Sequence, residues 1–125
     1  MNNCTDPTNQ CPITTVMDIV GGKWKLPILW HLSRRKTRFN ELQRKLVTIT
    51  QRTLTLQLRE LERDGMVLRK IYPEVPPRVE YSLTELGNSI RPIIKDMCRW
   101  GAIYNQANKP DEKTVADFST QCRDI

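Results

Sequence analysis

Apolar residues recur at helical spacing in the middle of the chain, between Thr50 and Gly65. Leu54, Leu58 and Leu61 stand at positions i, i+4 and i+7, so they share one side of a helix. Thr50 is a favourable N-cap residue, and Gly65 suits the left-handed conformation that follows many helices. The pattern predicts one amphipathic helix with a face that packs and an opposite, polar face.

The same spacing rules divide the rest of the chain into further helices and two strands. Helices are expected at residues 11–20, 23–32, 39–46 and 84–104, and strands at residues 66–72 and 78–83. Pro27 is tolerated if it lies in the first turn of its helix, and it kinks that helix if it lies deeper. Three prolines between the strands exclude regular structure there, so the strands form a hairpin with a stiff tip, a wing.

This order of elements describes a winged helix domain of the α+β class, mainly α. The helix at 39–46, a brief turn and the capped helix at 50–65 make a helix-turn-helix. We expect this one domain at 11–104, between a flexible N-terminal segment at 1–10 and a C-terminal tail at 105–125. A chain of 125 residues suffices for a single domain with its own core.

Positive charge is concentrated around the helix-turn-helix. The formal net charge is +6, but residues 23–70 hold 13 basic and 4 acidic side chains. A local excess of this kind favours a polyanionic partner, although a basic face that only keeps the protein in solution would have the same composition. The side chains on the polar face of the helix at 50–65 therefore decide between the two interpretations.

That polar face carries the residue types needed to enter a DNA major groove. Arg52 can pair bidentately with a guanine, and Gln51 can pair with an adenine. Thr55 or Leu56 can touch a thymine methyl group. The set expected to face DNA on this helix is Gln51, Arg52, Thr55, Leu56 and Arg59.

Two arginines of this helix have acidic neighbours that offer another partner. Arg59 and Arg63 lie within one helical turn of Glu60 and Glu62, and ion pairs there would occupy their guanidinium groups. We favour such a pair for Arg63, because Glu60 and Asp64 are both close to it in sequence.

Basic side chains outside this helix are expected to contact the DNA backbone. Arg78 follows the stiff tip of the wing, which suits a minor groove or a phosphate, and the alternative is a surface hairpin with incidental charge. Further phosphate contacts are expected from Arg35, Lys36 and Arg38, and more weakly from Lys23 and Lys25. The domain at 11–104 is thus predicted to bind double-stranded DNA.

Several segments in the same order resemble one family, the HxlR-type transcription regulators, which are relatives of the MarR-type winged helix proteins. These segments are CPI at 11–13, GGKW at 21–24, RFNEL at 38–42, TQRTLTLQLRELERDGMV at 50–67, PPRVEYSLTELG at 76–87 and RWG at 99–101. The resemblance implies a dimeric, cytoplasmic regulator of transcription that binds DNA. Members are often repressors and often respond to oxidants or electrophiles.

A single winged helix reads only a short half-site, so we expect a homodimer on a pseudo-palindromic operator. The amphipathic terminal helices are the natural dimer surfaces, because the last one has a wider apolar face than one small core can use. The expected interface consists of Ile13, Val16, Met17, Ile90, Ile94, Met97, Trp100 and Tyr104. The alternative is that Ile90, Ile94 and Met97 only close the core of the monomer.

The N-terminal segment contains neither a secretion signal nor a membrane span, so we expect a cytoplasmic protein whose four cysteines are reduced by default. Cys11 precedes a proline at a helix start, where backbone N–H groups favour the thiolate and hence a sensing role. A cysteine with no role is the alternative. Cys4 and Cys122 could act as resolving partners, whereas Cys98 lies within a helix and is expected to be buried.

Metal, cofactor and enzyme functions find no support in the sequence. The cysteines lack zinc-like spacing, and His31, the single histidine, is more plausible as a helix-end residue beside the helix dipole. No phosphate loop or nucleophile motif is present in the sequence. Two other interpretations stay open: a regulator that responds to a small-molecule inducer without a sensing thiol, and a winged helix that binds proteins.

Overall fold

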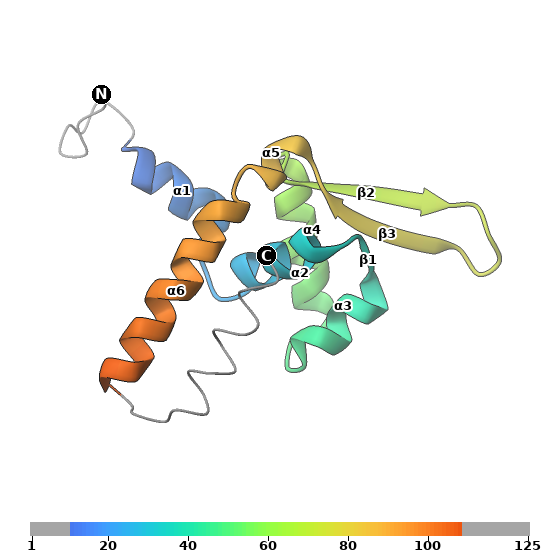
Figure 1. The fold of residues 1–125 in the computed structure, drawn as a ribbon. Helices are drawn as coiled ribbons and strands as arrows, with labels where there is room; N and C mark the ends of the chain where they lie inside the picture. Colours follow the sequence, from blue (N-terminus) through green and yellow to red (C-terminus); the bar gives the residue numbers. More distant parts are fainter. Residues whose placement is uncertain (1–10, 109–125) are drawn as a thin grey trace.

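A computed structural model describes residues 11–108 of the chain (Figure 1). Its elements are α1 (Pro12–Val20), α2 (Lys25–Arg34), β1 (Thr37–Arg38), α3 (Phe39–Leu46), α4 (Gln51–Arg63), β2 (Val67–Tyr72), β3 (Arg78–Leu83), α5 (Glu85–Asn88) and α6 (Arg91–Asn108). The expected segment at 1–10 lies outside the described residues, as does most of the expected tail. The helix predicted to end at residue 104 in fact continues to Asn108.

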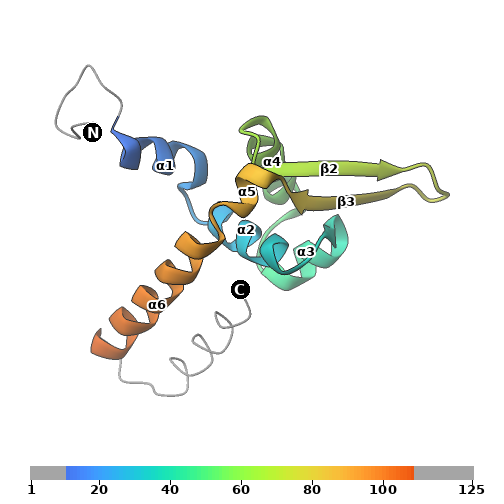
Figure 2. The ribbon, with the colours of Figure 1, turned by 45° about the horizontal axis from the view of Figure 1, so that its top comes forward.

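The helices α2, α3 and α4 form the centre of the domain, and the two long strands extend from it as the wing (Figures 1 and 2). Helices α1 and α6 lie at the opposite end in both views. Pro27 is the third residue of α2, so it lies in the first turn, where a missing N–H costs no hydrogen bond. The DNA-facing and dimer-facing surfaces predicted from the sequence therefore belong to opposite ends of one domain.

The sheet has one strand more than the sequence predicts. Its order is β1-β3-β2, and all neighbours are antiparallel. In β1, Thr37 lies opposite Tyr81 and Arg38 lies opposite Glu80. Thr37 is 1% exposed, and its hydroxyl donates a hydrogen bond of 3.0 Å to the Arg35 carbonyl. Two residues are too few to show an alternating pattern, which is why β1 was not predicted.

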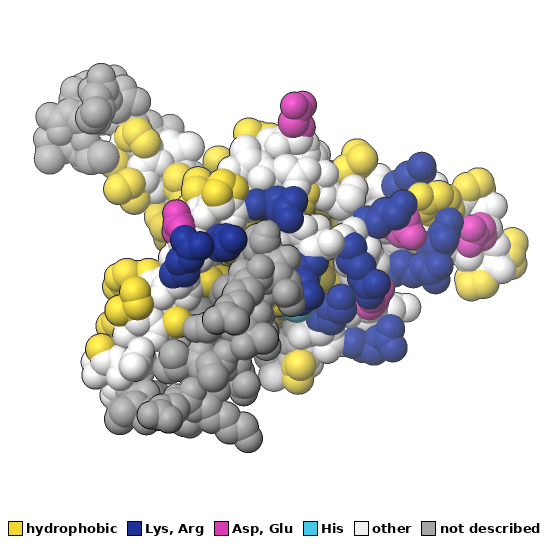
Figure 3. Space-filling model, viewed as in Figure 1, with side chains coloured by type: hydrophobic (Ala, Val, Ile, Leu, Met, Phe, Trp, Pro, Cys, Tyr) yellow, Lys and Arg dark blue, Asp and Glu magenta, His cyan; other side chains and the backbone are white. Residues whose placement is uncertain are grey.

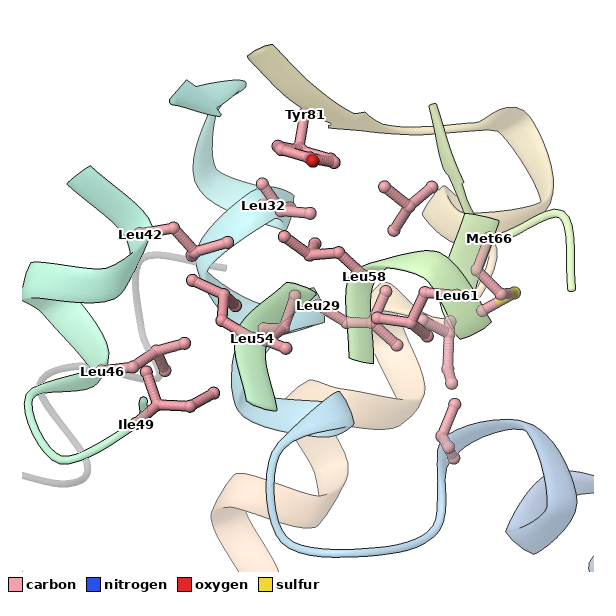
Figure 4. Packing of buried hydrophobic residues seen from close by; sticks show 14 of the residues in the cluster. Leu29, Leu32, Leu42, Leu46, Ile49, Leu54, Leu58, Leu61, Met66 and Tyr81 are labelled. Atoms are coloured by element: carbon pink, nitrogen blue, oxygen red, sulfur yellow. The ribbon is translucent and has the colours of Figure 1, made fainter. Parts of the chain in front are cut away.

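The core confirms the leucine stripe of α4. Leu54, Leu58 and Leu61 are almost completely buried, and they pack with residues of the neighbouring helices that include Leu29 of α2 and Leu42 of α3 (Figure 4). Burying one such side chain is worth about 1.5–3 kcal/mol. The stripe thus fixes which face of α4 turns inward, and so which face turns to solvent.

The single last helix predicted from residue 84 is wrong, because the structure divides it into α5 and α6. Thr84 does act as an N-cap, but of α5, where its hydroxyl accepts a hydrogen bond of 3.0 Å from the Gly87 N–H. Pro92 explains the break, since it has no N–H to donate to the carbonyl of Asn88. The apolar spacing continues across the break and conceals it in the sequence.

Candidate nucleic-acid interface

Both ends of α4 are fixed by the residues that the sequence predicts. The Thr50 hydroxyl accepts a hydrogen bond of 3.1 Å from the Thr53 N–H, which satisfies one of the open donors of the first turn. Gly65 follows the helix with φ +79°, in the left-handed region that favours glycine. The caps place residues 51 and 52 in the first turn, where a recognition helix reaches base edges.

The outer face of α4 turns its predicted DNA-reading side chains to solvent. Gln51, Arg52, Leu56 and Arg59 are exposed, and together with Thr50 and Thr55 they line one shallow hollow. The Thr55 hydroxyl donates a hydrogen bond of 2.8 Å to the Gln51 carbonyl, which leaves its methyl group and a lone pair for a partner. Within residues 11–108, neither Arg52 nor Arg59 makes an ion pair. Their charges are therefore available to an anionic partner.

Arg63, the third arginine of α4, makes an ion pair with an acidic neighbour, as predicted. Arg63 contacts Asp64 with its Nε 3.2 Å from Oδ1, and the hydrogen bond to Asp64 raises the pKa of Arg63. Glu60, the other partner considered, instead pairs with Lys25 of α2 at 2.7 Å. Lys25 is 7% exposed, so its placement among the weaker phosphate contacts is wrong. It joins α2 to α4 inside the domain.

In the basic segment before α3, one of the three predicted phosphate-binding side chains makes an ion pair within the protein. Arg35 pairs with Glu41 of α3 through a hydrogen bond of 2.5 Å. Lys36 and Arg38 are exposed and make no ion pair in the described part of the chain. Two of the three predicted phosphate contacts in this segment are thus open to a partner, whereas Arg35 would have to share its guanidinium with Glu41.

Arg78 lies along the wing and does not project from its tip. Its guanidinium carbon is 3.9 Å from the centre of the Tyr72 ring, and its side chain is 27% exposed. One terminal nitrogen is 3.2 Å from Glu74, and the other is 3.8 Å from Glu80. The sequence pointed to this arginine but not to its two carboxylate partners. Acidic side chains also lie among the Lys and Arg side chains of the wing in Figure 3.

His31 lies in the last turn of α2, as predicted, but as a neutral ring. Burial, together with the positive charges of Lys45 and Arg34, lowers the pKa of His31 to about 4. It therefore carries no charge for the helix dipole at neutral pH. No three His, Cys, Asp or Glu side chains among residues 11–108 are grouped so that they could hold a metal ion.

The predicted dimer residues divide into two groups. Six have large exposed side chains on α1 and α6: Ile13, Val16, Met17, Met97, Trp100 and Tyr104. Ile90 and Ile94 are 9% and 4% exposed and belong to the core of the monomer. For these two residues the alternative holds, namely that they close the monomer core and do not form a dimer surface. Several exposed apolar side chains lie at this end of the molecule in Figure 3. Ile93 and Ile103 are also exposed, and the helical spacing of α6 could have identified them.

The two cysteines within the described residues have different surroundings. Cys11 is the N-cap residue of α1 and is half-buried. Cys11 is disulfide-bonded in the structure, which differs from the expectation of a reduced thiol. Cys98 is half-buried against the core, close to the expectation for it.

A capped helix with an open basic face, held in a helix-turn-helix beside a basic wing, defines a winged helix DNA-binding protein of the kind that regulates transcription. The chain belongs to the family described as HxlR-like helix-turn-helix, whose model matches residues 19–109. The relatives are regulators of transcription and not enzymes.

Three relatives illustrate the membership. YdeP of Bacillus subtilis (strain 168), described as an uncharacterized HTH-type transcriptional regulator, is 54% identical over 100 residues, covering 80% of this chain and 78% of that protein. HypR, described as a redox regulator, matches in its oxidised form with TM-score 0.71 and 49% identity, covering 79% of this chain and 98% of that chain. Its reduced form matches with TM-score 0.73 and 47% identity, covering 82% and 99%. A MarR-family structure from Porphyromonas gingivalis W83 matches with TM-score 0.74 and 41% identity, covering 80% and 96%.

Among the described helices, none combines the length and the apolar character needed to cross a membrane.

Proposed function

We propose that the protein is a cytoplasmic, homodimeric repressor that binds a pseudo-palindromic operator. In each protomer, α4 enters the major groove of one half-site, and the wing and the segment before α3 contact the backbone. The observation that carries this proposal is the outer face of α4, where Arg52 and Arg59 are exposed and make no ion pair within residues 11–108. Cations kept open in this way are suited to phosphates and base edges.

The test of base reading compares two arginines of the same helix. The operator is first recovered by selection from a genomic DNA pool, and its affinity is measured by mobility shift. Arg52→Ala is expected to weaken operator binding by about tenfold to a hundredfold, the value of one good bidentate base contact. Arg63→Ala is the matched control, because Asp64 already occupies that side chain, and it should change affinity far less. Unchanged operator affinity in Arg52→Ala would refute its role.

Salt dependence separates DNA binding from use of the winged helix as a protein-binding module. Phosphate contacts release counterions, so the logarithm of the affinity should fall steeply and linearly with the logarithm of the salt concentration. Replacing Lys36 or Arg38 with alanine should reduce that slope by about one for each phosphate that the side chain neutralises. An affinity for DNA that is weak and insensitive to salt would favour the protein-binding module.

The dimer proposal rests on the exposed apolar side chains of α1 and α6. Met17, Met97 and Trp100 are 58%, 49% and 65% exposed, and large contiguous apolar surfaces of this kind usually mark an interface. Trp100→Glu should shift the protein toward monomer in sedimentation and weaken operator binding while its helical content stays unchanged. Leu68→Glu on the wing is the control, since Leu68 is 54% exposed but lies away from both helices. A dimer that persists in Trp100→Glu would exclude that residue from the interface.

Cys11 is the proposed sensor of oxidants or electrophiles. It lies at the N-terminus of α1, within the proposed dimer surface, and the similar protein HypR is described as a redox regulator in both an oxidised and a reduced form. In protein that is first reduced, so that the disulfide of Cys11 is opened, an oxidant such as diamide should release the operator, and Cys11→Ser should abolish this release. Retained release in that variant would reject the thiol and favour a small-molecule inducer. Measuring basal operator affinity in the same variant separates lost sensing from lost binding.

A further inference from the structure

We propose that Glu74 at the wing tip competes with the DNA backbone for Arg78 and so limits the affinity of the wing for any DNA. The inference rests on the proposed function and concerns the same surface. Its basis is that Arg78, which lines a hollow at the wing, already pairs with a carboxylate of its own chain, that of Glu74, at 3.2 Å.

The Arg78 guanidinium is held in place from one side. Tyr72 lies directly opposite it in the antiparallel pair, and the ring centre is 3.9 Å from the guanidinium carbon. The Nε of Arg78 is buried and makes no hydrogen bond to any of residues 11–108. A cation stacked on an aromatic face keeps its plane while its terminal N–H groups stay available. Arg78 can therefore exchange an anion at its outer end without moving its side chain.

The two carboxylates around Arg78 are not equivalent. Glu80 is 15% exposed, and its position in the sheet is opposite Lys70 of β2 and Arg38 of β1. Glu74 is 53% exposed, and the ion pair that it makes is with Arg78. An exposed pair of this kind is weak, because water screens it and both side chains lose freedom. Glu80 thus orients the cluster, and Glu74 is the anion that a phosphate can replace.

A phosphate would have room at this position. Residues of the wing tip and of the start of α3 line a hollow of about 650 Å³, which includes the side chains of Arg38, Arg44 and Arg78. Glu74 lines the same hollow. Glu41 lines it too, but Arg35 and Lys45 already neutralise that carboxylate. A backbone phosphate that enters the hollow therefore meets three arginines and, as the carboxylate that competes for Arg78, Glu74. Binding therefore requires that Glu74 leave Arg78, and this cost applies to every DNA sequence, since phosphates carry no sequence information.

Glu74→Gln tests the exchange, because it keeps the shape of the side chain and removes its charge. We expect the affinities for operator and for random DNA both to rise by about three- to tenfold, and the salt slope to steepen by up to about one. Asp96→Asn on α6 is the matched control: it makes the same change in net charge and frees Arg99 from a pair of 3.1 Å, but at the end opposite the wing. It should leave both measurements unchanged.

Repeating the Glu74→Gln change in an Arg78→Gln variant tests whether its effect depends on Arg78. In Arg78→Gln, the Glu74→Gln change should have much less effect than in the wild type. An equal rise in both backgrounds would show that Glu74 only repels phosphates directly, and it would overturn the exchange. Unchanged or reduced affinity of Glu74→Gln, in a wild type that binds DNA with a steep salt slope, would also overturn it. A wild type without such binding would instead refute the proposed function itself.

Discussion

The ion pair between Lys25 and Glu60 leads to the prediction that replacing one partner destabilises the fold more than replacing the other. Lys25 begins α2 and Glu60 lies in α4, and their charged atoms are 2.7 Å apart. The Lys25 side chain is 8% exposed, whereas that of Glu60 is 29% exposed. We expect Glu60→Leu to destabilise the fold considerably more than Lys25→Met.

The size of each loss in stability depends on which charged group the variant leaves without a partner. Glu60→Leu strands a buried ammonium group, and breaking a buried pair in this way costs about 3–5 kcal/mol; we expect about 3 kcal/mol because part of the pair is hydrated. Lys25→Met strands a carboxylate that water can reach, which should cost only about 1 kcal/mol. The double variant removes both charges and should lie within about 1 kcal/mol of the wild type.

Urea denaturation followed by circular dichroism measures these differences. All variants are compared at one protein concentration, because the proposed dimerisation would add to the apparent stability. Glu62→Leu is the matched control on the same helix: Glu62 is 41% exposed and 3.9 Å from Arg69, so its loss should change stability by less than about 0.5 kcal/mol. Equal costs for the two single variants, or a double variant whose cost is their sum, would refute this account of the pair.

Three further predictions concern stability. Folding lowers the pKa of His31 from 6.5 to about 4, so the unfolded chain takes up the proton first as the pH is lowered. The free energy of unfolding should therefore fall as the pH decreases from 6.5 to about 4, and its dependence on pH should be less steep in His31→Phe. An equal dependence on pH in the two proteins would contradict the lowered pKa. Thr50→Ala removes the N-cap hydrogen bond of α4 and should cost about 1 kcal/mol in a thermal melt, whereas Thr50→Ser should cost little. Gly87→Ala would put a Cβ 2.1 Å from the Met66 carbonyl oxygen, so it should cost about 2–3 kcal/mol or prevent folding, and wild-type stability would exclude the close approach.

The parts of the fold that were predictable are those encoded by neighbours in sequence. The leucine stripe of α4, its N-cap Thr50 and the glycine at its end depend on spacing and local backbone geometry, and all three are found. β1 was missed because two residues form a strand only when β3 is beside them. The apolar period crosses the break between α5 and α6 and so predicts one helix, whereas the missing N–H of Pro92 marks the break.

For the candidate site, the sequence predicts which basic residues are present, but not which of them make ion pairs within the protein. The pair between Arg63 and Asp64 joins adjacent residues, so it could be anticipated. The pair between Lys25 and Glu60 joins two helices, and its existence depends on how α2 packs against α4. Charge patterning alone treats all such cations alike, and only the tertiary structure separates those that hold the fold from those open to DNA.

The arrangement of α2 also bears on how a change at the proposed dimer surface would reach α4. α2 packs against both α6 and α4, and the pair between Lys25 and Glu60 adds a second link to α4 beside the leucine core. Packed cores and buried ion pairs resist deformation, so a displacement of α6 would be transmitted to α4 as a movement of the whole helix-turn-helix. The caps of α4 stay intact in such a movement. Release of the operator would then follow from a changed distance between two unaltered recognition helices, which the spacing of half-sites detects directly.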